Sequence, residues 1–238
     1  NGYDLQSTFN TSEVKLGVRY GKDEIIIIDN NRRISFNPSK WSIVALIYAK
    51  GFQWALGDFR YDKLNFYLYQ KINVSLLGVS RYELDVGKIF GAVPYGLLKN
   101  HLGNEMIFYA SSAFNTMNFN EFTSNQYLSL RYRHFFEGFV LNKIPLIKQL
   151  KWRTVANANL LYGNLKEQNI IEYDLTIHDD DFLGNLNPFH PNIPYIELGY
   201  GVENIFKFFR VDFFHRINYL NLPTAKPFHV QISAQIIL

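Results

Sequence analysis

The clearest pattern of hydrophobic and polar positions lies between residues 208 and 238. In its first half, two unlike rows alternate: Val211, Phe213, His215, Ile217 and Tyr219 against Arg210, Asp212, Phe214, Arg216 and Asn218. After the turn-forming residues 221–227, an apolar row (Phe228, Val230, Ile232, Ala234, Ile236, Leu238) opposes a polar one (His229, Gln231, Ser233, Gln235). A period of two residues predicts β-strands with unlike faces. We interpret them as strands of an outer-membrane β-barrel, whereas a soluble sandwich would bury the apolar row.

The same alternation recurs along the chain and predicts about ten strands. They cover residues 13–20, 24–36, 41–51, 63–74, 81–87, 127–137, 151–164, 195–203, 210–219 and 228–238. The second is the least regular, because Asp29-Asn30-Asn31 marks a bulge or an early end. The predicted fold is an all-β, antiparallel up-and-down transmembrane barrel that forms one region, 1–238.

Two long polar connections, residues about 92–125 and 165–194, interrupt the strands. If the last strand ends at the periplasm, both connections fall on the outside, and the short joins near Asn37, Leu77 and Asn204 fall inside. Short inner turns and long outer loops are typical of such barrels. Since the chain begins at Asn1 without a signal peptide, we expect it to be part of a longer precursor, whose remaining strands complete a larger barrel.

Composition agrees with membrane strands rather than membrane helices. Hydrophobic residues make up 47% of the chain, yet the mean hydropathy is only −0.12, because apolar and polar residues interleave. The longest apolar runs, 25–28 and 43–47, are far shorter than the ~20 residues of a membrane-spanning helix. Aromatic residues, at 17%, suit girdles at two membrane interfaces. The absence of Cys excludes thiol chemistry and disulfides, and a net charge of +3 gives no reason to expect nucleic acid.

Charged residues gather on the rows that face away from the apolar ones. The predicted lumen network consists of Arg131, Arg133, Glu137, Arg153, Glu197, Arg210, Asp212 and Arg216. The predicted lipid-facing row consists of Leu128, Leu130, Val211, Phe213, Val230, Ile232 and Ile236. The arginines could line an anion-selective pore. Because both signs of charge are present, we favour a network of ion pairs that braces the lumen.

Few residues are candidates for chemistry. The acidic cluster His178, Asp179, Asp180 and Asp181 is a weak metal candidate, since it lacks the ligand spacing of an EF-hand and suits a solvated loop. The sequence has neither a Gly-x-Ser-x-Gly motif nor a compact Ser/His/Asp grouping, which a membrane lipase would need. We therefore expect no metal, no cofactor and no enzymatic activity.

Several segments resemble a known family. They are residues 87–95 (GKIFGAVPY), 114–118 (FNTMN), 142–146 (NKIPL), 194–197 (PYIE) and 201–206 (GVENIF). Together they are similar to the C-terminal region of a Bacteroidota outer-membrane family of unknown function, in which a carboxypeptidase-regulatory-like domain precedes a β-barrel. The resemblance runs from about Tyr61 onward. A more distant similarity links this barrel to the BamA-like superfamily, although the Val-Arg-Gly-Phe loop signature of that group is absent.

The sequence therefore predicts a non-enzymatic protein of the bacterial outer membrane, an accessory or scaffold subunit of a complex for biogenesis, secretion or uptake. Its expected partners are outer-membrane lipid and other envelope proteins. Two alternatives stay open, a diffusion channel and a lipid-modifying enzyme.

Overall fold

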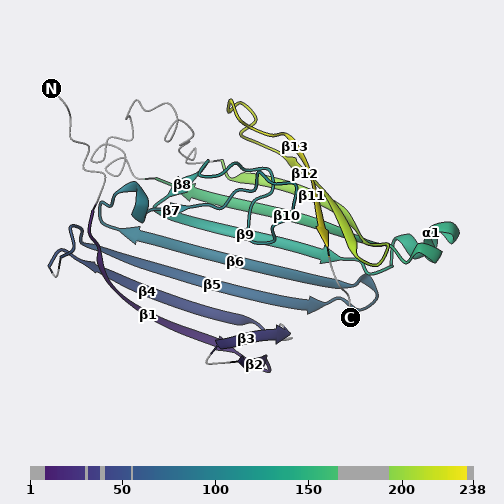
Figure 1. Ribbon diagram of the computed structural model, residues 1–238, viewed down its shortest axis with the longest axis horizontal. Helices are drawn as coiled ribbons and strands as arrows, with labels where there is room; N and C mark the ends of the chain where they lie inside the picture. Colours follow the sequence, from purple (N-terminus) through teal and green to yellow (C-terminus); the bar gives the residue numbers. More distant parts are fainter. Residues whose placement is uncertain (1–8, 30–31, 38–40, 55, 166–192, 235–238) are drawn as a thin grey trace.

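The computed structural model describes residues 9–29, 32–37, 41–54, 56–165 and 193–234. In these residues nine strands form one antiparallel sheet (Figure 1). In spatial order they are β1 (Ser12–Gly21), β4 (Ile43–Phe52), β5 (Tyr61–Asn73), β6 (Val79–Phe90), β9 (Gln126–Phe135), β10 (Arg153–Asn164), β11 (Tyr195–Ile205), β12 (Phe209–Arg216) and β13 (Phe228–Ala234). Spatial order follows chain order, so the all-β class and the up-and-down antiparallel order are confirmed.

The predicted strand 24–36 is wrong. Its residues form a separate hairpin, β2 (Ile25–Asp29) and β3 (Arg32–Asn37), which pairs within itself, Ile28 opposite Arg33. Four consecutive isoleucines, 25–28, show no alternation, and the polar run after them divides the segment into two short pieces. The described residues therefore contribute nine strands to the large sheet, with β4 antiparallel to β1.

The prediction of a closed barrel is also wrong for the described residues, because β1 and β13 do not pair and form the two edges of an open sheet. Part of the β13 edge is occupied by another segment. The amide of Ile232 donates to the carbonyl of Ile107, and the amide of Tyr109 donates to the carbonyl of Ile232. A parallel bridge thus joins Phe108 to Ile232 where a closing strand would pair.

The two faces of the sheet differ in chemistry. We call outer face the one that carries Leu46, Phe66, Val86 and Leu128, which are direct neighbours across β4, β5, β6 and β9. The inner face carries the opposite row, Glu83, Arg131, Asn159, Glu197 and Arg216, which are neighbours across β6, β9, β10, β11 and β12. The alternation that the sequence shows is therefore a difference between two sides of one continuous sheet.

The connection between β6 and β9, residues 91–125, folds back over the inner face (Figure 1). We call it the inner segment. It contains a short helical turn, η2 (Tyr95–Leu97), and a small sheet of β7 (Lys99–Asn100) and β8 (Thr123–Ser124). Its Phe114, Met117 and Phe122 form a buried cluster with Tyr127 and Leu161 of the sheet. A connection predicted as a long loop is thus a covering layer, while its place outside the cell stays a prediction.

The other connections alternate between the two ends of the sheet. The β5–β6 turn with η1 (Ser75–Leu77) lies at the same end as η3 (Leu141–Lys143) and α1 (Pro145–Leu150), which follow β9 (Figure 1). The predicted loop 165–194 lies almost entirely outside the described residues. No helix in the described part of the chain has the length and apolar content to cross a membrane.

Inner-face glycines allow neighbouring strands to place aromatic rings flat on the sheet. A Cβ atom at Gly87 would overlap the ring of Tyr127, its direct partner on β9. A Cβ atom at Gly199 would lie 2.6 Å from the ring of Phe214 on β12. Glycines allow a sheet to bend, and an aromatic residue of the next strand that covers a glycine helps to fix the register of the two strands. Both rings are buried or nearly so, and the Tyr127 hydroxyl donates to Asp85 on β6.

Candidate functional site

The predicted lumen residues lie on the inner face, where most of them enter hydrogen-bonded networks. Arg210 and Asp212, two residues apart on β12, form a bidentate pair, with Nε and Nη2 each 2.6 Å from a carboxylate oxygen. Both side chains are almost completely buried. A fork-to-fork arrangement is the strongest geometry for an arginine and a carboxylate, so this pair fixes the inner face of β12.

Three further arginines pair with carboxylates that sequence analysis did not assign to them. Arg216 Nη2 lies 2.6 Å from Glu121 Oε1 of the inner segment, and both side chains are fully buried. Arg131 and Arg133 share Glu83 of β6, at 3.0 and 3.9 Å. Glu83 could have been predicted as an inner-face partner of an arginine, because it lies on the same polar row as Asp85. Glu121 gave no such signal, since it lies in the predicted loop.

Glu197 does not pair with an arginine as predicted but holds the inner segment. Its Oε1 accepts from the amide of Asn115 at 2.9 Å and from Nδ2 of Asn159 at 2.7 Å. Its Oε2 accepts from the amide of Thr116 at 2.9 Å, from Thr116 Oγ1 at 2.9 Å and from the hydroxyl of Tyr195 at 3.2 Å. The side chain is completely buried. Five donors can stabilise a buried carboxylate without a cation.

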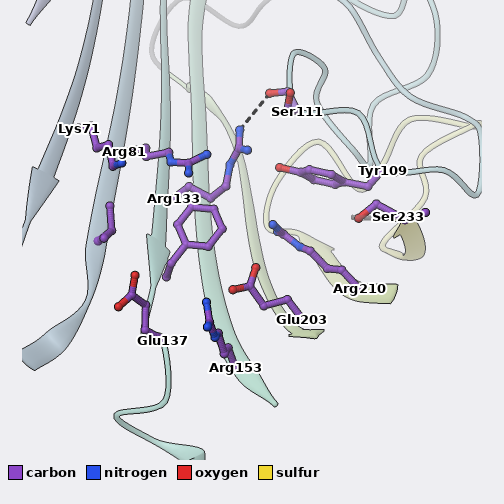
Figure 2. A pocket seen from close by; sticks show the side chains of 13 residues that line it. Lys71, Arg81, Tyr109, Ser111, Arg133, Glu137, Arg153, Glu203, Arg210 and Ser233 are labelled. Atoms are coloured by element: carbon purple, nitrogen blue, oxygen red, sulfur yellow. Dashed lines mark hydrogen bonds between the residues drawn. The ribbon is translucent and has the colours of Figure 1, made fainter. Parts of the chain in front are cut away.

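A polar pocket of about 580 Å³ opens on the inner face, close to the end that carries the β5–β6 turn. Five basic and two acidic side chains line it: Lys71, Arg81, Arg133, Arg153, Arg210, Glu137 and Glu203. Figure 2 shows these charged groups around the cavity, with Tyr109 and Ser111 of the inner segment on one side. The pocket brings together four predicted lumen residues, Arg133, Glu137, Arg153 and Arg210, with Lys71 and Arg81, which sequence analysis did not single out.

The predicted lipid-facing residues lie on the outer face as far as the structure describes them. Leu128 opposes Val86 and Tyr162 there, and Val211 opposes Ile232. Leu130, Phe213 and Val230 belong to the same face, whereas Ile236 lies outside the described residues. The contact of this face with lipid stays a prediction.

Histidines and acidic residues give no sign of metal chemistry in the described part of the chain, where no group of three or more potential ligands comes together. The weak candidates, His178 and Asp179 to Asp181, lie outside the described residues. His101 of the inner segment is buried, with Nε2 2.7 Å from Ser124 Oγ. Burial, with smaller contributions from Lys99 and Arg131, lowers the pKa of His101 to about 3, so the ring is neutral near pH 7.

Fold and site together define an all-β protein whose open antiparallel sheet has an apolar outer face and a charged inner face covered by its own inner segment. Residues 4–177 match the C-terminal domain of a family of unknown function, DUF5686, and the chain belongs to this family. The expected membership of a family of unknown function is thereby confirmed. A search of curated proteins found no match to the chain.

Proposed function

We propose that the sheet is part of the wall of a transmembrane β-barrel in the bacterial outer membrane, and that the protein acts without catalysis as an accessory or scaffold subunit of an envelope complex. The observation that carries this proposal is the exposed apolar outer face. On the family resemblance of the sequence, we also propose that the envelope is that of a Bacteroidota bacterium and that the barrel is distantly related to the BamA-like superfamily.

The exposure of apolar side chains on the outer face supports contact of this face with lipid. Leu46 on β4 is 48% exposed and Leu198 on β11 is 46% exposed, although both strands have a neighbour on each side. Apolar residues continue across all nine strands, which at about 4.8 Å per strand is a band roughly 40 Å wide. Water-soluble proteins rarely expose contiguous apolar patches of more than a few hundred Å². A band of this width suits hydrocarbon better than water.

The open edges support a wall that further strands complete. On β1, Val14, Leu16, Val18 and Tyr20 are all more than half exposed. A long edge strand with an apolar row is a site for pairing with another strand, and a bilayer permits only closed arrangements of strands. We propose that additional strands pair with β1 and with the free part of β13.

The inner segment supports a scaffold rather than a pore. It covers the inner faces of β9 to β13 through Arg131, Glu197, Arg216 and His229, each of which binds its backbone or side chains. A diffusion channel remains the second candidate, favoured by the charges of the polar pocket. Single-channel recordings in planar bilayers separate the two, because a sealed lumen gives no conductance steps and a channel gives steps that depend on ion charge.

The membrane proposal can be tested with neighbouring cysteine variants, since the chain has no native Cys. Leu46→Cys places a fluorescent label on the outer face and Ile47→Cys places it on the inner face of the same strand. In liposomes with quenchers on the acyl chains, we expect strong quenching at position 46 and little at position 47. Equal quenching at both positions, or none at 46, would remove the basis of the proposal.

The scaffold role needs a separate measurement. Purification from native membranes in mild detergent, followed by identification of the co-purifying proteins, should yield a reproducible set of envelope proteins. A preparation that contains the protein alone, across several detergents and with cross-linking before extraction, would contradict the role in a complex.

A further inference from the structure

The polar pocket is built where seven strands of the sheet and the inner segment meet. Lys71 comes from β5, Arg81 from β6, Arg133 from β9 and Arg210 from β12, while Tyr109 comes from the inner segment. Because the charged groups come from several different strands, the shape of the pocket is determined by the fold and not by a single loop (Figure 2).

Three of the cations stand side by side in one row. Lys71 is the direct partner of Arg81 across β5 and β6, and Arg81 is the direct partner of Arg133 across β6 and β9. Like charges directly opposite each other destabilise a pair of strands. In the row, only Arg133 has an ion pair with a described residue, Glu83, at 3.9 Å. The repulsion between these cations destabilises the strands, and a bound anion would offset it.

The guanidinium groups are held in place by aromatic rings. Arg81 lies over the ring of Phe135, 4.6 Å from its centroid, and Arg210 lies over the ring of Tyr109 at 4.8 Å. Figure 2 shows Arg81 and Arg210 extending toward the cavity from opposite sides. Stacking on a ring uses the face of a guanidinium, so the N–H edge of Arg81 stays available to an oxyanion, whereas Nε and Nη2 of Arg210 are bound to Asp212.

Two polar atoms in the wall support a ligand with acceptor oxygens. Arg81 Nε and Ser233 Oγ are two of six buried side-chain atoms of the described residues that have no hydrogen-bond partner. Both residues line the pocket. Buried donors almost always have a partner in native proteins, and each exception needs an explanation. A ligand with several acceptor oxygens in the pocket offers a partner to each of them.

We propose that the pocket binds a phosphoryl group, as an inorganic polyphosphate, a soluble phosphate ester or the headgroup of a phospholipid. Several cations converging on one cavity favour a multiply charged anion over a single carboxylate, and arginine forks match the oxygens of a phosphoryl group. A cavity of about 580 Å³ has room for more than a single phosphate ion. Glu137 and Glu203, in the lower part of Figure 2, offset part of the positive charge and repel the oxygens of an anionic ligand on that side of the pocket.

The test measures binding of pyrophosphate to the full chain in neutral detergent, by calorimetry in a phosphate-free buffer. We expect saturable binding to the original chain. The double variant Lys71→Gln/Arg81→Gln should weaken binding by about tenfold or more. The matched control Lys63→Gln removes a charge from the same strand and face outside the pocket, and it should change the affinity by less than about twofold.

A second arm identifies the source of the phosphoryl group. Competition by phosphatidic acid in mixed micelles, but not by phosphatidylcholine, indicates a lipid headgroup, while binding of pyrophosphate without such competition indicates a soluble ligand. Absence of binding by either probe to the original chain would refute the site, and so would equal weakening in the pocket and control variants. If the double variant does not fold, Arg81→Lys keeps the charge and removes the fork, and it should still weaken binding.

Discussion

At the scale of single residues, the inner face depends on carboxylates that are satisfied by many donors at once. Glu197 accepts from five groups, and Glu121 accepts from Arg216 and from the amide of Asn118 at 2.8 Å. A charged group that is buried with its hydrogen bonds complete stabilises a single arrangement, and one that loses a partner destabilises it strongly. These side chains therefore act as fixed points between the sheet and the inner segment.

His101 makes the stability of the inner segment depend on pH. Its pKa is lowered to about 3 by burial, whereas an unfolded histidine has a pKa of about 6.5. Between pH values of about 6.5 and about 3, the proton binds to the imidazole mainly in the unfolded chain. The free energy of unfolding should therefore fall as pH decreases through this window, by up to about 1.4 kcal/mol per pH unit. Urea unfolding in detergent between pH 7 and pH 5 measures this slope.

The matched variant for this prediction is His101→Gln, which keeps a group able to hydrogen-bond Ser124 but does not titrate. Its slope between pH 7 and pH 5 should be smaller by the contribution of His101. Identical slopes in the two proteins would mean that the imidazole takes up protons equally in the folded and unfolded states, which would contradict the lowered pKa.

At the scale of elements, the inner segment is attached to the sheet mainly by polar contacts. It lies against β9 through Arg131, which donates to the Ser112 carbonyl at 2.7 Å, and against β13 through His229 and Asn115. Buried apolar residues such as Phe122 add to the attachment. Polar contacts fix the position of a covering layer because hydrogen bonds are directional and a buried polar group that loses its partner is costly.

Glu197→Gln tests this attachment. The amide group of glutamine cannot accept from both backbone amides of Asn115 and Thr116, so one buried donor loses its partner. We expect the free energy of unfolding to fall by about 1–3 kcal/mol, together with faster hydrogen exchange at these two amides. The partly exposed pair of Glu13 with Lys63, at 3.5 Å, provides the control Glu13→Gln, which should cost less than about 1 kcal/mol. Unchanged exchange at residues 115 and 116 would contradict the anchoring role.

At the scale of the whole molecule, one substitution tests whether the outer face contacts lipid or water. Leu128 lies among apolar neighbours on β9 and is 38% exposed. Leu128→Arg should cost about 2–4 kcal/mol if this face lies near the middle of a bilayer. In water the same change at an exposed position costs less than about 0.5 kcal/mol. Unfolding by urea from lipid vesicles measures the difference.

Leu146→Arg is the control for this prediction, because Leu146 is 81% exposed on α1, away from the sheet. Its effect should be small in vesicles. If both variants unfold at the same urea concentration as the original chain, the outer face is in contact with water.

The strands could be predicted from sequence because the two faces of the sheet meet different surroundings. Residues 127–137 alternate strictly between apolar and polar side chains. Strand β9 covers Gln126–Phe135, and it places Leu128 on the outer face and Arg131 on the inner face, as predicted. The isoleucines 25–28 carry no such signal, so their hairpin was missed. The inner segment was missed for a different reason, since polar residues such as Asn115, Thr116 and Glu121 are normally exposed but here are buried by partners far along the chain. The pairing of Glu121 with Arg216, 95 residues away, has no local signature.

Because of the bridge between Phe108 and Ile232, the edge of β13 can pair at this point with the inner segment or with another strand, but not with both. The amide and the carbonyl of Ile232 can serve either the inner segment or an arriving strand, but not both. Any chain that docks along this side of the sheet must therefore stop short of Ile232 or dislodge residues 107–109. Pairing of a strand along the full edge of β13 and displacement of residues 107–109 would then be a single event, decided at Ile232.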